Sequence, residues 1–135
     1  METKIRSLTH PWNLSPKDAK TLQIQLSRRV VRESEINIEN VTSVTGIDTH
    51  YQGDLSLAVA VTIRLPELET VECSTAVKRA TFPYVSGLLA FREGPAILTA
   101  LKNLSTAPAL LMFDGHGIAH PRRCGLASHI GLLMD

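Results

Sequence analysis

Three β-rich segments follow one another in this chain, and after them come a helical segment and one short apolar strand. Residues 41–47 are rich in β-branched side chains, and residues 55–65 alternate small or apolar side chains with others. The turn residues Gln52-Gly53-Asp54 lie between these two segments, and residues 66–69 separate the second from a third strand at residues 70–80. Strands joined by short turns predict an antiparallel meander.

The second half of the chain predicts a crossover back to this sheet. Residues 82–87 are expected to form a loop, and Gly94-Pro95 is expected to open a helix that runs to about Leu104. The wholly apolar run at residues 109–113 predicts a strand that is covered on both faces. A strand reached through a crossover helix pairs in parallel, so the predicted fold class is α/β, a mixed sheet with flanking helices.

Two further helices are expected nearer the ends of the chain. Ser15 can cap a helix that starts at Pro16, and apolar residues then recur at helical spacing as far as Val30. Residues 123–134 predict a final helix whose apolar residues face inward.

Length and composition favour one small domain over residues 1–135. Of the 135 residues 44% are hydrophobic, and the formal net charge is +1, so neither a disordered chain nor a histone-like coat on a polyanion is expected. No apolar run approaches the roughly 18–20 residues of a membrane helix, and the polar residues 1–4 do not resemble a secretory signal. We therefore expect a cytoplasmic protein without a membrane partner. Cys73 and Cys124 are too few for a disulfide scaffold and match no zinc spacing.

Three carboxylates stand where chemistry could occur. Asp114 follows the apolar strand, where an acid either lies at the ligand-binding edge of an open α/β sheet or ends the strand in an Asx turn. Asp48 falls within a predicted central strand, where Asp is rare without a partner or a metal, although a turn stays open as an alternative. Glu93 lies at the expected start of a helix, where it could also complement the helix dipole.

The predicted topology could bring these three carboxylates together. Parallel pairing of the first strand with residues 109–113 would place Asp48 beside Asp114, and Glu93 could approach from the crossover. Three converging carboxylates repel one another and favour a hard divalent cation, Mg²⁺ or Mn²⁺. Such ions stabilise the attacking and leaving oxygens in phosphodiester hydrolysis.

Histidine and tyrosine side chains offer other possibilities. His116 and His120 would form a zinc site only on one helix face, and Gly117 and Pro121 disfavour a helix here. His120 fits better as a phosphate or metal-water contact beside Pro121-Arg122-Arg123, or as part of a merely solvated basic cluster. Tyr84 either packs in the core or is a rigid aromatic wedge of the kind that some DNA-bending proteins insert between bases.

Two long motifs carry a resemblance to a known family. Residues 82–95, FPYVSGLLAFREGP, and residues 114–129, DGHGIAHPRRCGLASH, closely resemble the signatures of the endonuclease V family. Gly46-Ile47-Asp48 matches the acid on that family's first strand, and the segment from His10 to Leu14 suits its N-terminal helix. The resemblance covers almost the whole chain.

What the resemblance implies is a ribonuclease-H-like fold and a Mg²⁺-dependent endonuclease, with Mn²⁺ as a substitute ion. The family recognises deoxyinosine, the product of adenine deamination, in DNA and hydrolyses the second phosphodiester bond 3′ to the lesion; some members act on inosine in RNA. By position, the residues that resemble its catalytic, metal-binding carboxylates are Asp48, Glu93 and Asp114.

The same resemblance assigns residues to DNA binding. Tyr84 matches the wedge that separates the strands at the lesion, and Gly87 and Gly115 match the backbone of a pocket for the flipped base. The residues that resemble supports for phosphate or metal are Arg92, His116 and His120.

The sequence departs from the family pattern in two places. Ser86 stands where the family usually has proline, and the chain stops at Asp135, before a further strand, a lysine-bearing segment and a last helix with a fourth metal ligand. We therefore expect a C-terminally truncated domain in which the strand at residues 109–113 has a bare apolar edge that invites self-association. The alternative function is a catalytically impaired nucleic-acid-binding remnant, or a half-domain that needs a partner; a zinc hydrolase ranks third.

Overall fold

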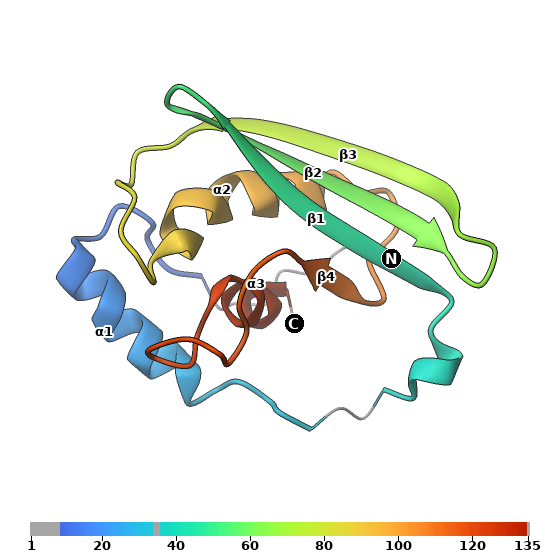
Figure 1. The fold of residues 1–135 in the computed structure, drawn as a ribbon, viewed down its shortest axis with the longest axis horizontal. Coiled ribbons are helices and arrows are strands. Elements are labelled where there is room, and N and C mark those ends of the chain that lie inside the picture. Colours follow the sequence, from blue (N-terminus) through green and yellow to red (C-terminus); the bar gives the residue numbers. More distant parts are fainter. Residues whose placement is uncertain (1–8, 34–35, 135) are drawn as a thin grey trace.

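A computed structural model describes residues 9–33 and 36–134 and shows a mixed four-stranded sheet with helices on one of its faces (Figure 1). The elements in chain order are α1 (Pro16–Ser27), the 3₁₀ turn η1 (Ile38–Asn40), β1 (Ser43–Gln52), β2 (Leu55–Arg64), β3 (Glu69–Arg79), α2 (Leu89–Lys102), β4 (Leu111–Phe113) and α3 (Leu126–Met134). Among the described residues, no helix is both long enough and apolar enough to cross a membrane.

The sheet has the strand order β3-β2-β1-β4. β2 pairs antiparallel with both β1 and β3, whereas β4 pairs with β1 in parallel. The predicted meander with a crossover back to its first strand is therefore confirmed. β1 extends beyond the predicted residues 41–47, so Asp48 lies well inside the strand.

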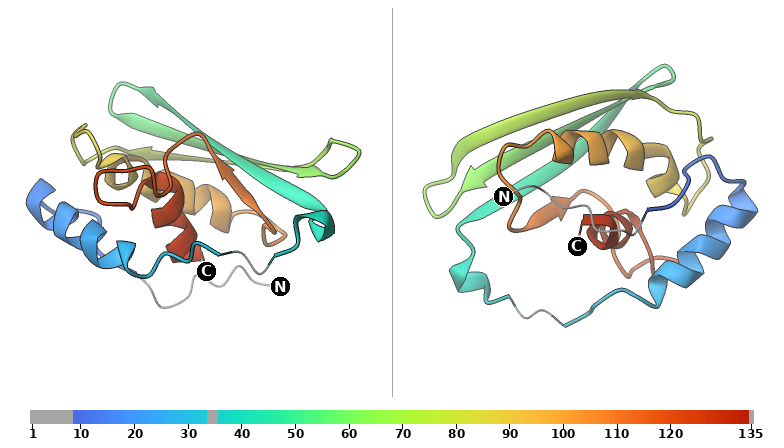
Figure 2. Two further views of the ribbon diagram at one scale, coloured as in Figure 1. Left: turned by 60° about the horizontal axis from the view of Figure 1, so that its bottom comes forward. Right: turned by 180° about the vertical axis from the view of Figure 1, so that it is seen from behind.

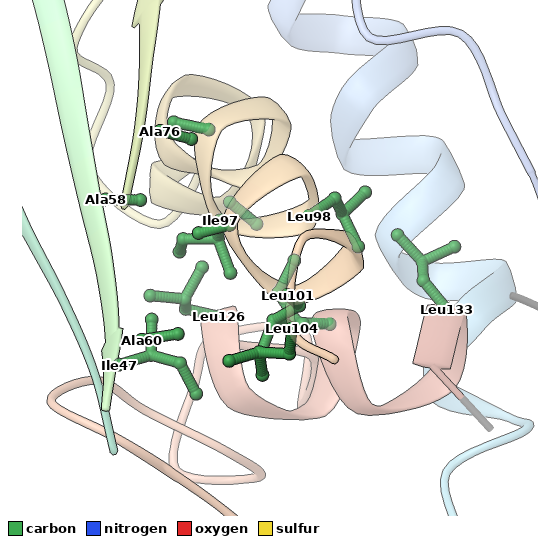
Figure 3. Packing of buried hydrophobic residues seen from close by; sticks show 14 residues of the cluster. Ile47, Ala58, Ala60, Ala76, Ile97, Leu98, Leu101, Leu104, Leu126 and Leu133 are labelled. Atoms are coloured by element: carbon green, nitrogen blue, oxygen red, sulfur yellow. The ribbon is translucent and has the colours of Figure 1, made fainter. Parts of the chain in front are cut away.

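The core lies between the sheet and α2 (Figure 3). Ala58 and Ala60 of β2 face the helix, and their small side chains leave room for larger ones. Ile97 of α2 and Leu126 of α3 point toward these alanines (Figure 3). All four side chains are at most 6% exposed, and full burial of one Ile or Leu stabilises a fold by roughly 1.5–3 kcal/mol. This packing holds the crossover against the meander.

α2 begins at Leu89, and the prediction that the Gly-Pro pair opens it is wrong. Pro95 lies inside the helix, where it lacks an N–H for the usual hydrogen bond. Ala90 and Phe91 are each 2% exposed, so their burial stabilises the helical turn before the proline. Glu93 therefore lies beyond the first turn, where the helix dipole has little effect. The dipole alternative for Glu93 does not apply.

The C-terminal elements are shorter than predicted. Met112 of β4 is 62% exposed, so the expected cover on both faces is wrong. β4 is an edge strand of the sheet, and the helices all lie below the sheet in the tilted view (Figure 2, left). α3 begins at Leu126 and not at the predicted Arg123. The φ of Arg123 is +56°, which lies outside the right-handed helical region. Self-association through β4 stays a prediction.

Residues 9–15, which precede α1, contribute to an aromatic cluster and are not helical. The indole of Trp12 stacks on His129 with ring centroids 5.5 Å apart, and it meets Phe91 edge-on at 5.8 Å. A Cβ on Gly94 would lie 2.5 Å from this indole, so the contact between the segment and α2 depends on glycine. The cluster fixes His10 and Trp12 against α2 and α3.

His10 and His129 form a short hydrogen bond within this cluster. Nδ1 of His10 lies 3.0 Å from the carbonyl oxygen of Pro11, so Nδ1 carries the proton and Nε2 is left to accept. Nε2 of His129 therefore donates to Nε2 of His10, at 2.7 Å. The pKa of His129 is lowered to about 3, first by burial and then by the neighbouring His10 and His120. His129 is neutral in the folded protein at neutral pH.

We expect the free energy of unfolding to fall as the pH drops from about 6.5 toward 3. The pKa of His129 is lower in the folded state than its usual 6.5, so the unfolded chain takes up a proton that the folded chain does not. The loss approaches about 1.4 kcal/mol per pH unit from this group. Urea denaturation at several pH values measures it. His129→Phe should reduce the slope of the free energy of unfolding against pH by the equivalent of about one proton. His50→Gln, which changes an exposed histidine, is the control. An unchanged slope in His129→Phe would contradict the lowered pKa of His129.

Candidate metal and nucleic-acid site

Asp48 and Asp114 occupy equivalent positions, each directly after the last residue pair that joins β1 to β4. The parallel register pairs Ile47 with Phe113, so the next residue on β1 is Asp48 and the residue that follows β4 is Asp114. Paired strands are roughly 4.8 Å apart. Both aspartates are exposed. The structure thus brings two of the predicted carboxylates side by side.

A hollow of about 550 Å³ opens in front of this pair. Asp48 pairs with Val59 across β1 and β2, whereas Ile47 pairs with the buried Ala60, so the aspartate lies on the sheet face that points away from α2. Gly46 leaves space there, because a Cβ on it would meet nothing within 4 Å. The residues that line the hollow are Gly46, Ile47, Asp48, Val59, Val61, Met112, Phe113 and Asp114.

The electrostatics of the pair suit a cation. Among the residues that the structure describes, the ion pairs use the carboxylates of Asp54 and Glu69, not those of the hollow. Oδ1 of Asp48 accepts the backbone N–H of Thr49 at 2.9 Å. Adjacent carboxylates without a counter-charge repel each other. Mg²⁺ is commonly held by one or two carboxylates, with water and substrate phosphates as its other ligands, so the residues present fit this ion.

Glu93 lies on the inner side of the sheet. It is 6% exposed on α2 and neighbours Tyr51, which shares a strand face with Ile47. Burial, and after it the Glu93 carboxylate, raise the pKa of Tyr51, whose hydroxyl has no partner of good hydrogen-bond geometry in the described chain. Glu93 is not a lining residue of the hollow, and within residues 9–33 and 36–134 no three His, Cys, Asp or Glu side chains are grouped to hold a metal.

Arg92 connects this inner region to the loop that carries Tyr84. Its Nη1 donates to the carbonyl oxygen of Phe82 at 2.8 Å, and its guanidinium lies 4.7 Å from the centroid of the Tyr51 ring. Both contacts are internal. A role for Arg92 toward phosphate or metal stays a prediction.

Tyr84 projects from the loop between β3 and α2. Its side chain is 75% exposed, which excludes the core-packing alternative. After it the chain makes a tight turn, in which the N–H of Leu88 donates to the carbonyl of Val85 at 2.9 Å. Gly87 is the third residue of this turn and has a φ of +82°, as a type II turn requires. An exposed aromatic side chain beside this turn is compatible with the wedge role of Tyr84, which stays a prediction.

The carbonyl oxygen of Gly87 is the meeting point of three side chains. It accepts from Nε2 of Gln23 at 2.8 Å, from Nε2 of His120 at 2.7 Å and from Nη2 of Arg122 at 3.3 Å. Nδ1 of His120 accepts the backbone N–H of Arg122 at 3.0 Å. Neither ring nitrogen of His120 is therefore free for a phosphate or a metal in this structure.

Gln23 and Arg122 were not among the predicted site residues. Arg122 has no local pattern that separates it from the neighbouring arginine. Gln23 does carry a local signal, because it stands among the apolar residues of the buried face of α1, where its side chain is 1% exposed. A glutamine buried on a helix face needs partners.

Gly115 and His116 are exposed beyond Asp114. The carbonyl of His116 accepts the N–H of Ala127 at 2.9 Å, and Gly125 packs against this carbonyl so closely that a Cβ would clash. Residues 115–124 are not helical. His116 and His120 therefore do not share the helix face that a zinc site would need, and roles for Gly115 and His116 in DNA binding stay predictions.

Known proteins resemble this chain over most of its length. The sequence model of endonuclease V matches residues 24–135. The chain belongs to the endonuclease V family. The endonuclease V of Roseiflexus sp. (strain RS-1) is 44% identical to it over 130 residues, which are 96% of this chain and 58% of that protein.

Solved endonuclease V structures share the fold. That of Streptomyces avermitilis superposes with a TM-score of 0.86 at 40% identity and covers 98% of this chain and 58% of its own. Ciona intestinalis endonuclease V, in complex with a 24mer DNA containing an inosine followed by a ribo-adenosine, has a TM-score of 0.79 at 30% identity and covers 87% and 53%. The fold is therefore ribonuclease-H-like, as predicted. This chain spans less than two thirds of the length of these relatives.

We expect Mg²⁺ to stabilise this chain through the aspartate pair. For a dissociation constant near 1 mM, 10 mM Mg²⁺ would add about 1.4 kcal/mol to the free energy of unfolding. Thermal melting with and without the ion measures the effect. Asp48→Asn and Asp114→Asn should each abolish the increase, whereas Glu67→Gln, at the exposed β2–β3 turn, should retain it. Equal Mg²⁺ stabilisation of all four proteins would show that the ion binds elsewhere.

Proposed function

We propose that this chain carries the catalytic centre of a DNA repair endonuclease that recognises deoxyinosine and hydrolyses the second phosphodiester bond 3′ to the lesion with the help of Mg²⁺. The observation that carries the proposal is that Asp48 and Asp114 lie side by side in the lining of one open hollow. Membership of the endonuclease V family supports the activity, and the inosine-containing DNA bound to the Ciona relative supports the substrate class.

The aspartate pair would hold the cation and orient it toward the DNA backbone. A divalent cation supplies charge neutralisation at the scissile phosphate and a water of lowered pKa. Because the hollow is open, a phosphodiester can reach both carboxylates from solvent. The lining from β2 and β4 is apolar, so the two aspartates supply the charged groups of the hollow.

Recognition of the lesion is assigned to the loop around Tyr84. A tyrosine that is 75% exposed on a turn can enter the base stack without leaving a void in the core. Gly87 and Gly115 would let a flipped base approach the backbone closely. Glu93 would complete the metal-binding set only if it moved from its present contact with Tyr51.

A second candidate function is lesion binding without cleavage. The separation of Glu93 from the aspartate pair favours it, because only two of the three proposed carboxylates line the hollow. Both candidates share the loop of Tyr84 and differ in the chemistry at the hollow. One experiment therefore distinguishes them.

We expect the chain to nick a labelled duplex with a single deoxyinosine in the presence of Mg²⁺, leaving a 3′-hydroxyl and a 5′-phosphate. Asp48→Asn and Asp114→Asn should each slow nicking about 100-fold or more, because each removes a carboxylate that would hold the ion. Gel analysis of the nicked strand under single-turnover conditions measures the rate.

The matched control for this experiment is Asp54→Asn. Asp54 forms an exposed ion pair with Arg79 at the β1–β2 turn, and such pairs contribute little to stability. Its nicking rate should stay within about twofold of the wild type. Binding of the deoxyinosine duplex without any nicking would support the second candidate, and nicking that is equal in the wild type and in Asp114→Asn would rule out the proposed centre.

A further inference from the structure

One backbone oxygen joins three parts of the molecule that are far apart in the sequence. The carbonyl of Gly87 belongs to the loop of Tyr84, and its donors come from α1 and from the loop that follows Asp114. We call the side chains of Gln23, His120 and Arg122 the Gly87 donor group. A carbonyl oxygen has two lone pairs, so these three donors leave it no free acceptor capacity, with Arg122 as the longest contact at 3.3 Å.

The Gly87 donor group is also bonded within itself. Nε of Arg122 donates to Oε1 of Gln23 at 2.6 Å, so the Gln23 amide contacts both Arg122 and the carbonyl. Gln23 is 1% exposed, which makes this an internal network. In the described chain no carboxylate forms an ion pair with Arg122. Its charge is directed at two neutral oxygens, which fixes their positions through charge-assisted hydrogen bonds.

The space around Gly87 is matched to this arginine. A Cβ on Gly87 would lie 2.8 Å from Nη2 of Arg122, so a side chain there would displace the guanidinium. The φ of +82° at Gly87 also favours glycine. The second residue of the same turn is Ser86. A proline at this position would restrict the backbone of the turn more than any other residue. The turn therefore depends on side-chain donors for much of its rigidity.

Tyr84 lies between two fixed carbonyl groups. The carbonyl of Phe82, two residues before it, accepts from Arg92 at 2.8 Å. The carbonyl of Gly87, three residues after it, accepts from the Gly87 donor group. His120 and Arg122 belong to the same loop as Asp114, so the second of these contacts ties the loop of Tyr84 to the carboxylate pair.

We propose that Arg122, held by Gln23 and His120, is a positioning residue that sets the place of the Tyr84 loop relative to Asp114, and so couples recognition of the deaminated base to the cut. The proposal rests on the proposed function. Arg122 acts through the Gly87 carbonyl and does not line the hollow of Asp48 and Asp114. Its loss should weaken productive binding of the lesion more than it slows the chemical step.

The test replaces Arg122 and separates binding from chemistry. Arg122→Met should raise KM for a deoxyinosine duplex about tenfold and change kcat less than threefold, as expected when charge-assisted hydrogen bonds that place a binding loop are lost. Arg122→Lys keeps one donor for Gly87 but loses the bond to Gln23, and should fall between. Arg29→Met, on an exposed arginine after α1, is the matched control with an unchanged KM.

A second substitution tests whether the lost property is loop rigidity. Ser86→Pro fixes the backbone of the turn without restoring any donor. In the Arg122→Met background, Ser86→Pro should lower the raised KM at least threefold. No recovery would overturn the positioning role, as would a fall in kcat at unchanged KM, or unchanged values of both in Arg122→Met.

Hydrogen exchange in the protein without DNA tests the contact between Arg122 and the Gly87 carbonyl independently of nuclease activity. The Leu88 amide, which closes the turn, should exchange about tenfold faster in Arg122→Met than in the wild type and in Arg29→Met. Unchanged exchange would overturn the positioning contact itself. If the wild type shows no nicking while Leu88 exchange responds as expected, the proposed function has failed and the coupling to the cut fails with it, whereas the structural contact stands.

Discussion

The three residue pairs that join β4 to β1 place the two halves of the chain against each other. Thr45, Gly46 and Ile47 pair in parallel with Leu111, Met112 and Phe113. A shift of one residue would turn Asp114 to the opposite face of the sheet from Asp48, because strand side chains alternate between faces. The register is supported from the inner side, where α2 and α3 pack on the small residues of β2 and hold the crossover in place. The carboxylate pair is thus a consequence of core packing on the other face.

The same alternation explains the position of Glu93. α2 covers the inner face of the sheet, so its buried residues meet Tyr51 and the residues that share its face, while Asp48 lies on the outer face. The outer face carries the hollow and the exposed Met112. The predicted topology could bring all three acids together, but strand order and direction do not tell on which face of the sheet the crossover helix packs. The relatives are longer than this chain, which spans 58% of the Roseiflexus protein.

Much of the fold follows from local patterns. The alternating segments and short turns predict β1, β2 and β3, and the apolar run before Asp114 predicts β4 and its parallel partner. The start of α2 could not be found this way, because burial of Ala90 and Phe91 outweighs the proline signal. The donors to the Gly87 carbonyl were missed for another reason: Gln23 and Arg122 are 99 residues apart, and their contact exists only in the folded chain.

We propose that Asp48 and Asp114 together hold one divalent cation. Electron paramagnetic resonance of Mn²⁺ with the purified chain measures this binding, because it counts bound ions without requiring nuclease activity. We expect one ion per chain and an affinity at least tenfold lower in Asp48→Asn or in Asp114→Asn. The combined loss of binding free energy in the double variant should be smaller than the sum of the two single losses, since one shared ion is lost only once. Binding of one ion with wild-type affinity by either single variant would contradict it.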